Sequence, residues 1–515
     1  MGRFRSWLGN TLFNIDKVVE SSVNSKLKGL TVPQTTGIEN YRMIENKVWA
    51  SANADNLLTF YKMNHDRSNA LLQDRLRFWQ WVGGIDVPKL HYPAPTALLQ
   101  HIKSLLFSEE VEIYIATGDE EKDVVYNKRK DDLLKDIEFN NKVQAGSYFE
   151  SYSGTLAVKF IIDKEVHDKP IIELYPRERI EIATKYGKAQ EIIFNDEYKV
   201  KDKVYTLKSY YGIGYIDYEL VDEKDKVVPL KTIPELAELE RLELGVPIPT
   251  AIYKKNKAVN AENPDSVYGG SDFEGVIDLF HQIDEIYSTL ALYIRRSRPT
   301  MMVDESLLPA SKDGSRTIIP KEYDFDMIKV RSLDDNKDKI YRSTPEIKTE
   351  QYMNSIKELN KAVYQTVGMS YTSVGLEGVG ANTSGEALRR IEKSTIIMRE
   401  AKIKLWIPFI EELIRLLFIY DDLLNNNTIS DLYEGIDIQV AFAEYNAQSF
   451  KELIEQYGDA KLKGLADTET AVNDIYTNKR GYNEEQRKVI TRNIKIEQGE
   501  PFVSSNQMVD DEGNA

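Results

Sequence analysis

The spacing of apolar residues predicts two long helices in the middle of the chain. In residues 271–299 the apolar side chains recur in alternating steps of three and four, which is a heptad-like stripe. Residues 345–368 repeat this spacing. At 1.5 Å per residue, the first helix is about 40 Å long. The stripe that we expect to be its packing face consists of Phe273, Val276, Phe280, Ile283, Tyr287, Leu290 and Ile294.

Polar residues at its two ends predict where the first helix begins and ends. Ser271 followed by Glu274 fits a capping box, in which each side chain satisfies a free amide of the first turn. Arg295 and Arg296 lie at the negative end of the helix dipole, and Pro299 stops the helix. The pattern therefore predicts a helix from Ser271 to the residue before Pro299.

Residues 299–344, between the two helices, contain the short β-type runs TMMV, TIIP and MIKV among many charged residues. The chain is thus expected to leave a compact body along one helix, form a small module and return along the other. Two interpretations remain open for this hairpin. It packs on its own domain, or, because the faces opposite the stripes are highly charged, it packs against neighbouring copies.

The N-terminal half of the chain predicts an α+β fold. Residues 41–150 are mainly helical in pattern, including the segments 70–82 and 96–107. From 155 to 230 the pattern changes to short β-type runs separated by charged or Gly/Pro turns, which is typical of a meandering antiparallel sheet. A connector rich in Pro, Asn and Gly follows at 245–270.

The C-terminal part begins with a third helix, expected from about Ser384 to Leu424. Pro408 lies inside it and should kink it, because proline lacks the amide hydrogen and clashes with the preceding turn. A strand-like run follows at 436–445, then polar helices from 447 to about 497. We expect residues 501–515 to be a disordered tail.

Composition narrows the classes of function. The chain has 515 residues, no cysteine, and 83 acidic against 67 basic residues, for a net charge of −16. The absence of cysteine excludes thiol catalysis and disulfide staples. The acidic balance argues against a surface that grips DNA through phosphate contacts, yet it permits a protein that DNA must slide past. No apolar run reaches the roughly 20 residues of a membrane span, so no membrane partner is expected.

The N-terminal segment, residues 1–40, shows no motif that we can place in a fold. Residues 1–30 are expected to form a basic amphipathic helix, with a role at a membrane surface as the alternative. The first residues, MGRFRS, fit a loose myristoylation pattern that is short and has many false positives.

A glycine-rich stretch, GLEGVGANTSGEALRR at 375–390, resembles a phosphate-binding loop but lacks its essential residues. Glu386 and Ala387 stand where a Walker A loop has Lys and Ser or Thr, and a carboxylate there repels phosphate. Thr383 with Glu386 fits a capping box that starts the third helix. The preceding residues, 371–382, are then a flexible loop between two long helices, or an ordinary surface loop.

Other chemical signatures are missing from the sequence. The five histidines are scattered without the spacing of a zinc site, and there is no nucleophile elbow. We therefore expect no catalytic residues, no metal and no cofactor. Two alternatives remain: a coiled-coil scaffold that dimerises through the stripe, and an acid/base hydrolase such as a glycosidase.

Three stretches carry a resemblance to a known family. They are YGGSDFEGVIDLFHQIDEIYSTL at 268–290, GANTSGEALRR at 380–390, and the pattern from DIQVAFAEY to GYNEEQ at 437–486. Together they resemble the portal proteins of tailed bacteriophages with long non-contractile tails, most closely the SPP1-like and A118-like group. The order of the parts extends the likeness over most of residues 41–500.

The resemblance implies a portal-type subunit with a mixed α/β wing, long stem helices, a small clip, a kinked long helix and a helical crown. Such subunits assemble into rings, typically of twelve, at one capsid vertex. By position, the parts would be the wing at 41–267 with 384–445, the stem helices at 268–298 and 345–369, the clip at 299–344, the tunnel loop at 370–383 and the crown at 446–500.

It also implies partners. Double-stranded DNA would pass through the ring, which would meet the terminase large subunit during packaging and the head–tail adaptor afterwards. The major capsid and scaffolding proteins would surround it, during assembly in the host cytoplasm and then in the virion. ATP hydrolysis would belong to the terminase, because this chain has no phosphate cradle.

Two groups of residues would meet the DNA. The tunnel loop would project Val374, Gly375, Leu376, Glu377, Gly378, Val379 and Gly380 toward it. Transient phosphate contacts would come from Arg295, Arg296, Arg298, Lys357 and Lys361. For Arg295 and Arg296, simple capping of the helix C-terminus is an equally good interpretation.

Overall fold

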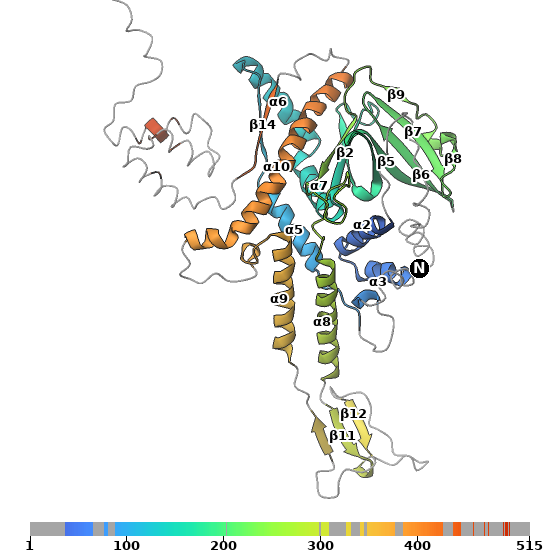
Figure 1. Ribbon diagram of the computed structural model, residues 1–515, viewed down its shortest axis with the longest axis vertical. Coiled ribbons are helices and arrows are strands. Elements are labelled where there is room, and N and C mark those ends of the chain that lie inside the picture. The colour runs from blue at the N-terminus through green and yellow to red at the C-terminus, as the bar shows by residue number, and fades with distance from the viewer. Residues whose placement is uncertain are drawn as a thin grey trace, which may run out of the picture. The chain divides into compact units, whose positions relative to one another are not determined.

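A computed structural model provides the fold (Figure 1). It describes residues 37–64, 77–80, 88–201, 203–297, 300–307, 326–330, 340–343, 348–375, 385–425 and 436–443, with a few isolated positions beyond. The expected N-terminal amphipathic helix, the C-terminal tail and nearly all of the expected crown lie outside these residues. The chain divides into two compact units, Met1–Phe442 and Ala443–Ala515, and the fold below is that of the first.

Helices form most of the N-terminal part, as predicted. They are α2 (Gly37–Ala50), α3 (Ala54–Met63), α5 (Ala94–Phe107), α6 (Glu120–Asp136) and α7 (Phe139–Ser153). Of the expected helix at 70–82, the structure describes 77–80, where Phe78–Gln80 form a short 3-10 turn, η2. The apolar faces of α5 and α7 pack into a core with fully buried Leu98, Phe160 and Trp406.

The β-type runs after α7 were expected to form one meander but divide into two sheets. Strands β2 (Thr155–Ile161) and β3 (Ile171–Pro176) pair with β10 (Ala251–Lys255) in a three-stranded antiparallel sheet. The single meander was wrong because the 3-10 turn Arg177–Arg179 separates β3 from the next strand, and because β2 takes a partner from far along the chain.

The second sheet has six strands and is the meander proper. Its path is β4 (Ile180–Lys185), β5 (Lys188–Val200), β6 (Lys203–Tyr211), β7 (Tyr215–Asp222) and β8 (Val227–Val228), with β9 (Leu242–Glu243) also on β7. All pairings are antiparallel. Two smaller apolar clusters, one around Phe194 and one around Leu220, pack on it.

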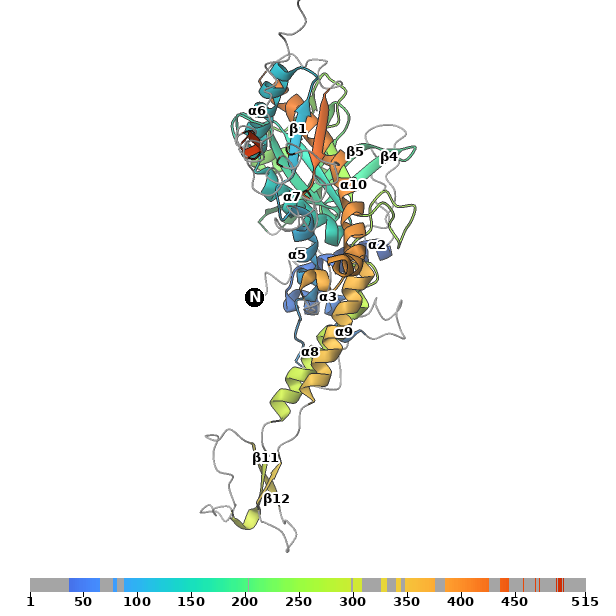
Figure 2. The same ribbon diagram turned by 90° about the vertical axis from the view of Figure 1, so that its left-hand side faces the viewer.

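The predicted helical hairpin is present. Helices α8 (Ile277–Arg296) and α9 (Thr349–Val367) lie side by side in both views (Figures 1 and 2). Between them in sequence is a small sheet of β11 (Thr300–Asp304), β12 (Asp326–Val330) and β13 (Ile340–Ser343). β11 is central, parallel to β12 and antiparallel to β13. Two of the expected runs, TMMV and MIKV, are strands, whereas TIIP lies outside the described residues.

The predicted capping box at the start of the hairpin was wrong. Helix α8 begins at Ile277, and its N-cap, Val276, makes no side-chain cap bond. Gly275 has a positive φ of 78°, which breaks the helical path after the turn that Ser271 begins. The Ser271 hydroxyl accepts from the amide of Phe273 instead, and the Glu274 carboxylate lies 3.5 Å from Lys257 Nζ.

The third long helix, α10 (Gly385–Leu424), runs continuously through Pro408 and is bent in Figure 1. Thr383 and the side chain of Glu386 lie outside what the structure describes, so the second capping box stays a prediction. The predicted strand after α10 is β14 (Asp437–Ala441), which pairs antiparallel with β1 (Glu112–Ala116). β1 was not predicted.

Candidate functional site

Most of the apolar stripe of α8 is buried within this one chain. Phe273, Val276, Phe280 and Ile283 are at most 1% exposed and belong to the main core. Leu290, further along, is also buried. The other two members of the stripe differ: Tyr287 is 36% exposed and Ile294 is 51% exposed. The first half of α8 therefore packs on its own domain, and of the seven stripe residues only Tyr287 and Ile294 remain available to another copy.

A buried carboxylate fixes α8 to the N-terminal part of the chain. Asp284 accepts hydrogen bonds from Trp79 Nε1 at 2.9 Å, from His91 Nδ1 at 2.8 Å and from the Tyr92 amide at 2.7 Å. Burial raises the pKa of Asp284, although these three donors oppose the shift. Hydrogen bonds to a carboxylate are stronger than those between neutral groups, so these three bonds hold α8 at a defined position on the N-terminal part of the chain.

His281, one turn earlier on α8, is a buried core residue. Its Nδ1 accepts from the Trp79 amide at 3.4 Å, and its Nε2 lies 3.0 Å from the Tyr61 hydroxyl. That hydroxyl donates in turn to Glu45, so His281 Nε2 must be the donor and the ring is neutral. Burial and the nearby positive charge of Arg77 hold the pKa of His281 well below its usual value.

Next to the segment that leads into α8 is a buried cluster of charges from four parts of the chain. Lys402 of α10 binds Asp272 at 2.8 Å and also the side chain of Asn256. Next to it, Lys254 of β10 pairs with Glu150 of α7, whose other oxygen accepts from an indole N–H of α10. Helices α7 and α10, strand β10 and the segment leading into α8 are therefore joined at one point.

Burial shifts the pKa values of this cluster. It lowers the pKa of Lys254 to about 8 and raises that of Glu150. Burial also opposes the ionisation of Asp272, but the charges of Lys402 and Lys257 outweigh it, so the pKa of Asp272 is lowered. Asp272 is therefore held as a carboxylate beside Lys402, and loss of Lys402 would remove the closest cation from a buried negative charge.

After α9 the chain turns into the expected tunnel loop. Gly368, in the left-handed conformation with φ 85°, ends the helix, and the amide of Ser370 donates to Thr395 Oγ1 of α10 at 2.8 Å. Val374 ends a short 3-10 turn, and Gly375 has a φ of 69°. The rest of the predicted loop lies outside the described residues: Leu376, Glu377, Gly378, Val379 and Gly380.

The basic residues expected to meet DNA lie at two levels of the hairpin. Arg295 and Arg296 are exposed in the last turn of α8, whereas Arg298 lies outside the described residues. Lys357 and Lys361 are nearer the body, on α9. Lys361 Nζ is 3.2 Å from Glu358 and 5.9 Å from the centre of the Tyr371 ring, the first residue of the loop turn.

Neither a metal centre nor a membrane span is found in the described ranges. Within them, no group of three or more His, Asp or Glu side chains is arranged to hold a metal ion. None of the helices described combines the length and apolar character needed to cross a bilayer.

A comparison with protein families decides the identity of this architecture. The family described as phage portal protein, SPP1 Gp6-like, matches residues 89–489, well over half of the chain. The chain belongs to this portal family. The match includes the hairpin, the small sheet between its helices, the loop after α9 and the whole of α10, so the resemblance of the three short stretches extends to most of the portal chain.

Other comparisons add little to this assignment. No curated protein matches the portal chain in sequence. Two similar chains come from solved structures described as the neck of an empty gene transfer agent (GTA) particle and the virion of a native GTA particle. The first is 7% identical with a TM-score of 0.37, over 81% of this chain and 92% of that one. The second is 9% identical with a TM-score of 0.37, over 86% and 99%.

Proposed function

We propose that this chain is the subunit of a portal ring at one capsid vertex of a tailed phage, through which double-stranded DNA is packaged and later ejected. The family match over residues 89–489 carries this proposal. The ring, typically of twelve subunits, would dock the terminase large subunit first and the head–tail adaptor afterwards. The major capsid and scaffolding proteins would surround it.

The hairpin fits this role because of its division into two halves. The half near the body is anchored by Asp284 and by the buried part of the stripe, so each subunit holds its own stem rigidly. The far half exposes Tyr287 and Ile294, which a neighbouring stem would cover. Head-to-tail contacts of this kind close into a ring when the rotation between subunits allows it.

The clip of the proposed portal is the small sheet of β11, β12 and β13, between the two stem helices in sequence. We assign to it the contact with terminase and then with the adaptor. The loop at 370–383 is the proposed tunnel loop. It leaves α9 and enters α10, and the bond of Ser370 to Thr395 connects its first residues to α10.

The acidic net charge of −16 suits a channel through which DNA must slide without being held. Arg295, Arg296 and Arg298 at the clip end of the stem, with Lys357 and Lys361 nearer the loop, would supply transient phosphate contacts. The alternative of a scaffold that dimerises through the whole stripe is weakened, because most of the stripe is already buried inside one chain.

A packaging assay tests the proposed function. Procapsids assembled with this protein should fill with DNA when terminase and ATP are added, and procapsids assembled without it should remain empty. Equal filling of both would refute the proposal. Filling that requires the chain but no terminase would refute the assignment of ATP hydrolysis to that partner.

A further inference from the structure

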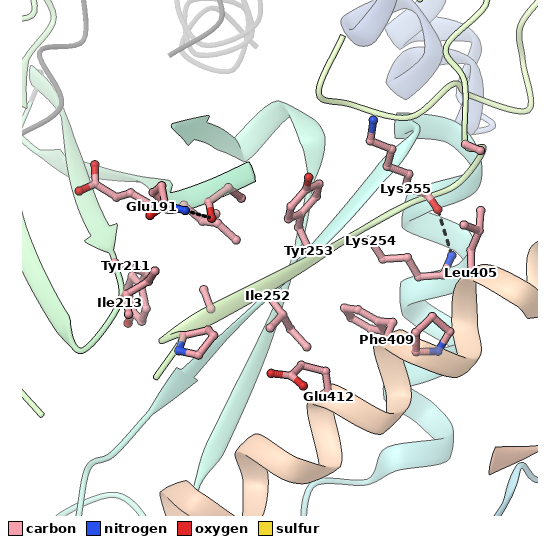
Figure 3. A pocket seen from close by; sticks show the side chains of 18 residues that line it. Glu191, Tyr211, Ile213, Ile252, Tyr253, Lys254, Lys255, Leu405, Phe409 and Glu412 are labelled. Atoms are coloured by element: carbon pink, nitrogen blue, oxygen red, sulfur yellow. Dashed lines mark hydrogen bonds between the residues drawn. The ribbon is translucent and has the colours of Figure 1, made fainter. Parts of the chain in front are cut away.

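A groove of about 660 Å³ lies between β10, the first residues of β5 and α10 (Figure 3). Its walls are mainly apolar and aromatic. Figure 3 shows Ile252 of β10 directed toward Phe409 and Glu412 of α10, and Tyr253 directed to the opposite side of the strand. This volume is in the range that binds a small ligand or a short peptide. Nothing in the proposed portal role uses it.

One side of the groove is the free edge of a β-sheet. β10 pairs with β2 alone, so it is an edge strand of its three-stranded sheet. Just before the strand begins, this edge is covered: the Thr250 amide donates to the Gly212 carbonyl, and Pro249 forms a β-bridge with Ile213. From Ala251 onward the strand has no partner on this side within the described part of the chain, and its residues line the groove.

The register shows which backbone groups face the groove. Thr250 O accepts from Phe160 N, and Asn256 N donates to Gly154 O. Hydrogen-bonded pairs alternate with non-bonded pairs in an antiparallel ladder. The backbone N–H and C=O groups of Ile252 and Lys254 therefore also point toward β2. The N–H and C=O groups of Ala251 and Tyr253 therefore point outward, and no described residue forms a hydrogen bond with them. An edge of this kind is a template for an added strand.

The opposite wall does not offer a second such edge. The start of β5 has an irregular register near Ala189, and the carbonyl of Ala189 accepts from the Gln190 side chain. An added strand would thus bond to β10 and rest its side chains on the apolar wall of α10. This geometry calls for a short extended peptide with apolar side chains on alternate positions.

We infer that the groove binds the segment of this same chain that precedes α2, as an extended strand on β10. The path of the chain supports this occupant. Helix α2 begins at Gly37, and Glu39 in its first turn accepts from Asn263 at 3.1 Å. Asn263 belongs to the loop that follows β10, and Ser266 of that loop accepts from Lys255 at the groove. The first turn of α2 is therefore connected, through this loop, to Lys255 at one end of the groove.

Upstream of Gly37, apolar residues fall on alternate positions at Phe13 and Ile15 and again in residues 27–32, and the second run is the one near enough to α2 to reach the groove. Residues 27–32 read LKGLTV, in which Leu30 and Val32 fall on alternate positions. Pro33, which lacks an amide hydrogen, ends the run. The few residues between the run and Gly37 span about 15 Å when extended. This assignment concerns only residues 27–32 and the groove and does not depend on the portal function.

Photo-crosslinking of the full chain tests the occupant. The crosslinking amino acid p-benzoylphenylalanine would replace Ile213, which lines the groove and is 44% exposed. The expected result is a link to residues 27–32 within one chain. The matched control places the same group at Val227, which is 59% exposed on β8, and should give no such link. A link from position 213 to a second copy or to another segment would overturn the proposal.

Hydrogen exchange provides a second readout that does not require a crosslinker. In the full chain, the amides of Ala251 and Tyr253 should exchange at least about tenfold more slowly than in the variant Leu30→Asp, Val32→Asp. The amides of Ile252 and Lys254 should not change, because they bond to β2. The control variant Leu8→Asp, Leu12→Asp should match the unmodified chain. Equal exchange of Ala251 and Tyr253 in all three proteins would show an unoccupied groove and overturn the proposal.

Discussion

Lys402 Nζ lies 2.8 Å from Oδ2 of Asp272, and this buried ion pair joins the long helix α10 to the residues that lead into α8. The tunnel loop is expected between the end of α9 and the start of α10. This contact thus links the helix that follows the loop to the segment before α8. The ion pair of Glu150 and Lys254 lies next to it.

Replacing Lys402 with Met should destabilise the subunit by about 3 kcal/mol, because the buried carboxylate of Asp272 loses its closest cation and retains only Lys257, whose Nζ is 3.8 Å away. Chemical unfolding followed by circular dichroism measures the change. The matched control is Lys404→Met, since Lys404 is exposed on the same helix. The double variant Lys402→Met, Asp272→Asn should recover part of the loss, and a single variant as stable as the control would contradict the account.

The two halves of the stripe should respond differently to substitution. Ile283→Ala, at a fully buried position, should cost the subunit about 2–5 kcal/mol through the cavity it leaves. Ile294→Glu, at a 51% exposed position, should leave subunit stability within about 0.5 kcal/mol but weaken ring assembly. Unfolding experiments and light scattering separate the two effects. Unchanged ring assembly in Ile294→Glu would remove this residue from the subunit interface.

His281 should make the subunit less stable as the pH falls. Its pKa in the folded chain is far below the ordinary value of about 6.5, so below that pH the unfolded chain binds a proton that the folded chain does not. Each pH unit in this window costs up to about 1.4 kcal/mol. Unfolding free energies measured from pH 7 to pH 5 test this.

The variant His281→Gln isolates the contribution of that histidine. The pKa of half-buried His101 is also lowered, so this residue too reduces stability as the pH falls. The raised pKa values of Glu150 and Asp284 have the opposite effect on stability, at lower pH. These groups remain in the variant, so only the difference in slope reports on His281. The unfolding free energy should fall less steeply with falling pH in the variant. Equal slopes in the two proteins would show that His281 is not neutral in the folded chain.

Deleting residues 374–380 should permit ring assembly yet disturb DNA packaging or retention, because the deletion removes the proposed tunnel loop but none of the buried stripe. The yield of DNA-filled heads, counted by electron microscopy, gives the result. Normal yields of filled heads would eliminate the proposed role of the loop.

Neutralising Arg295, Arg296 and Arg298 to Gln should change packaging or DNA retention while rings still form, because the proposed phosphate contacts are lost. The control variant replaces three exposed lysines in and just after the six-stranded sheet, Lys185, Lys188 and Lys231, with Gln. Both variants remove three positive charges, but the control removes them at positions away from the proposed channel. If the two variants give the same yield of filled heads, the arginines serve only to cap the helix.

Elements with a clear apolar period were predictable from sequence, and those set by long-range contacts were not. The hairpin, the strands β5 to β7 and α10 follow local patterns. The start of α8 was misplaced because Ser271 and Glu274 imitate a capping box, whereas the positive φ of Gly275 delays the helix to Ile277. Strand β1 becomes a strand only through pairing with β14, over three hundred residues away.

The buried charges were also beyond the reach of sequence. Glu150, Lys254 and Lys402 look like surface residues of ordinary helices and strands, and only the packing of four elements buries them together. Asp284 gave the one available signal, a carboxylate one turn from His281 on the flank of an apolar stripe. The exposed arginines and the glycine-rich loop could be named from sequence, but their contact with DNA stays a prediction.

Electron microscopy of the purified protein, with the mass per particle recorded alongside, tests the central claim most directly. The portal account predicts rings with a central hole, of about twelve subunits. A discrete dimer without a channel would contradict it and would favour the scaffold or the hydrolase.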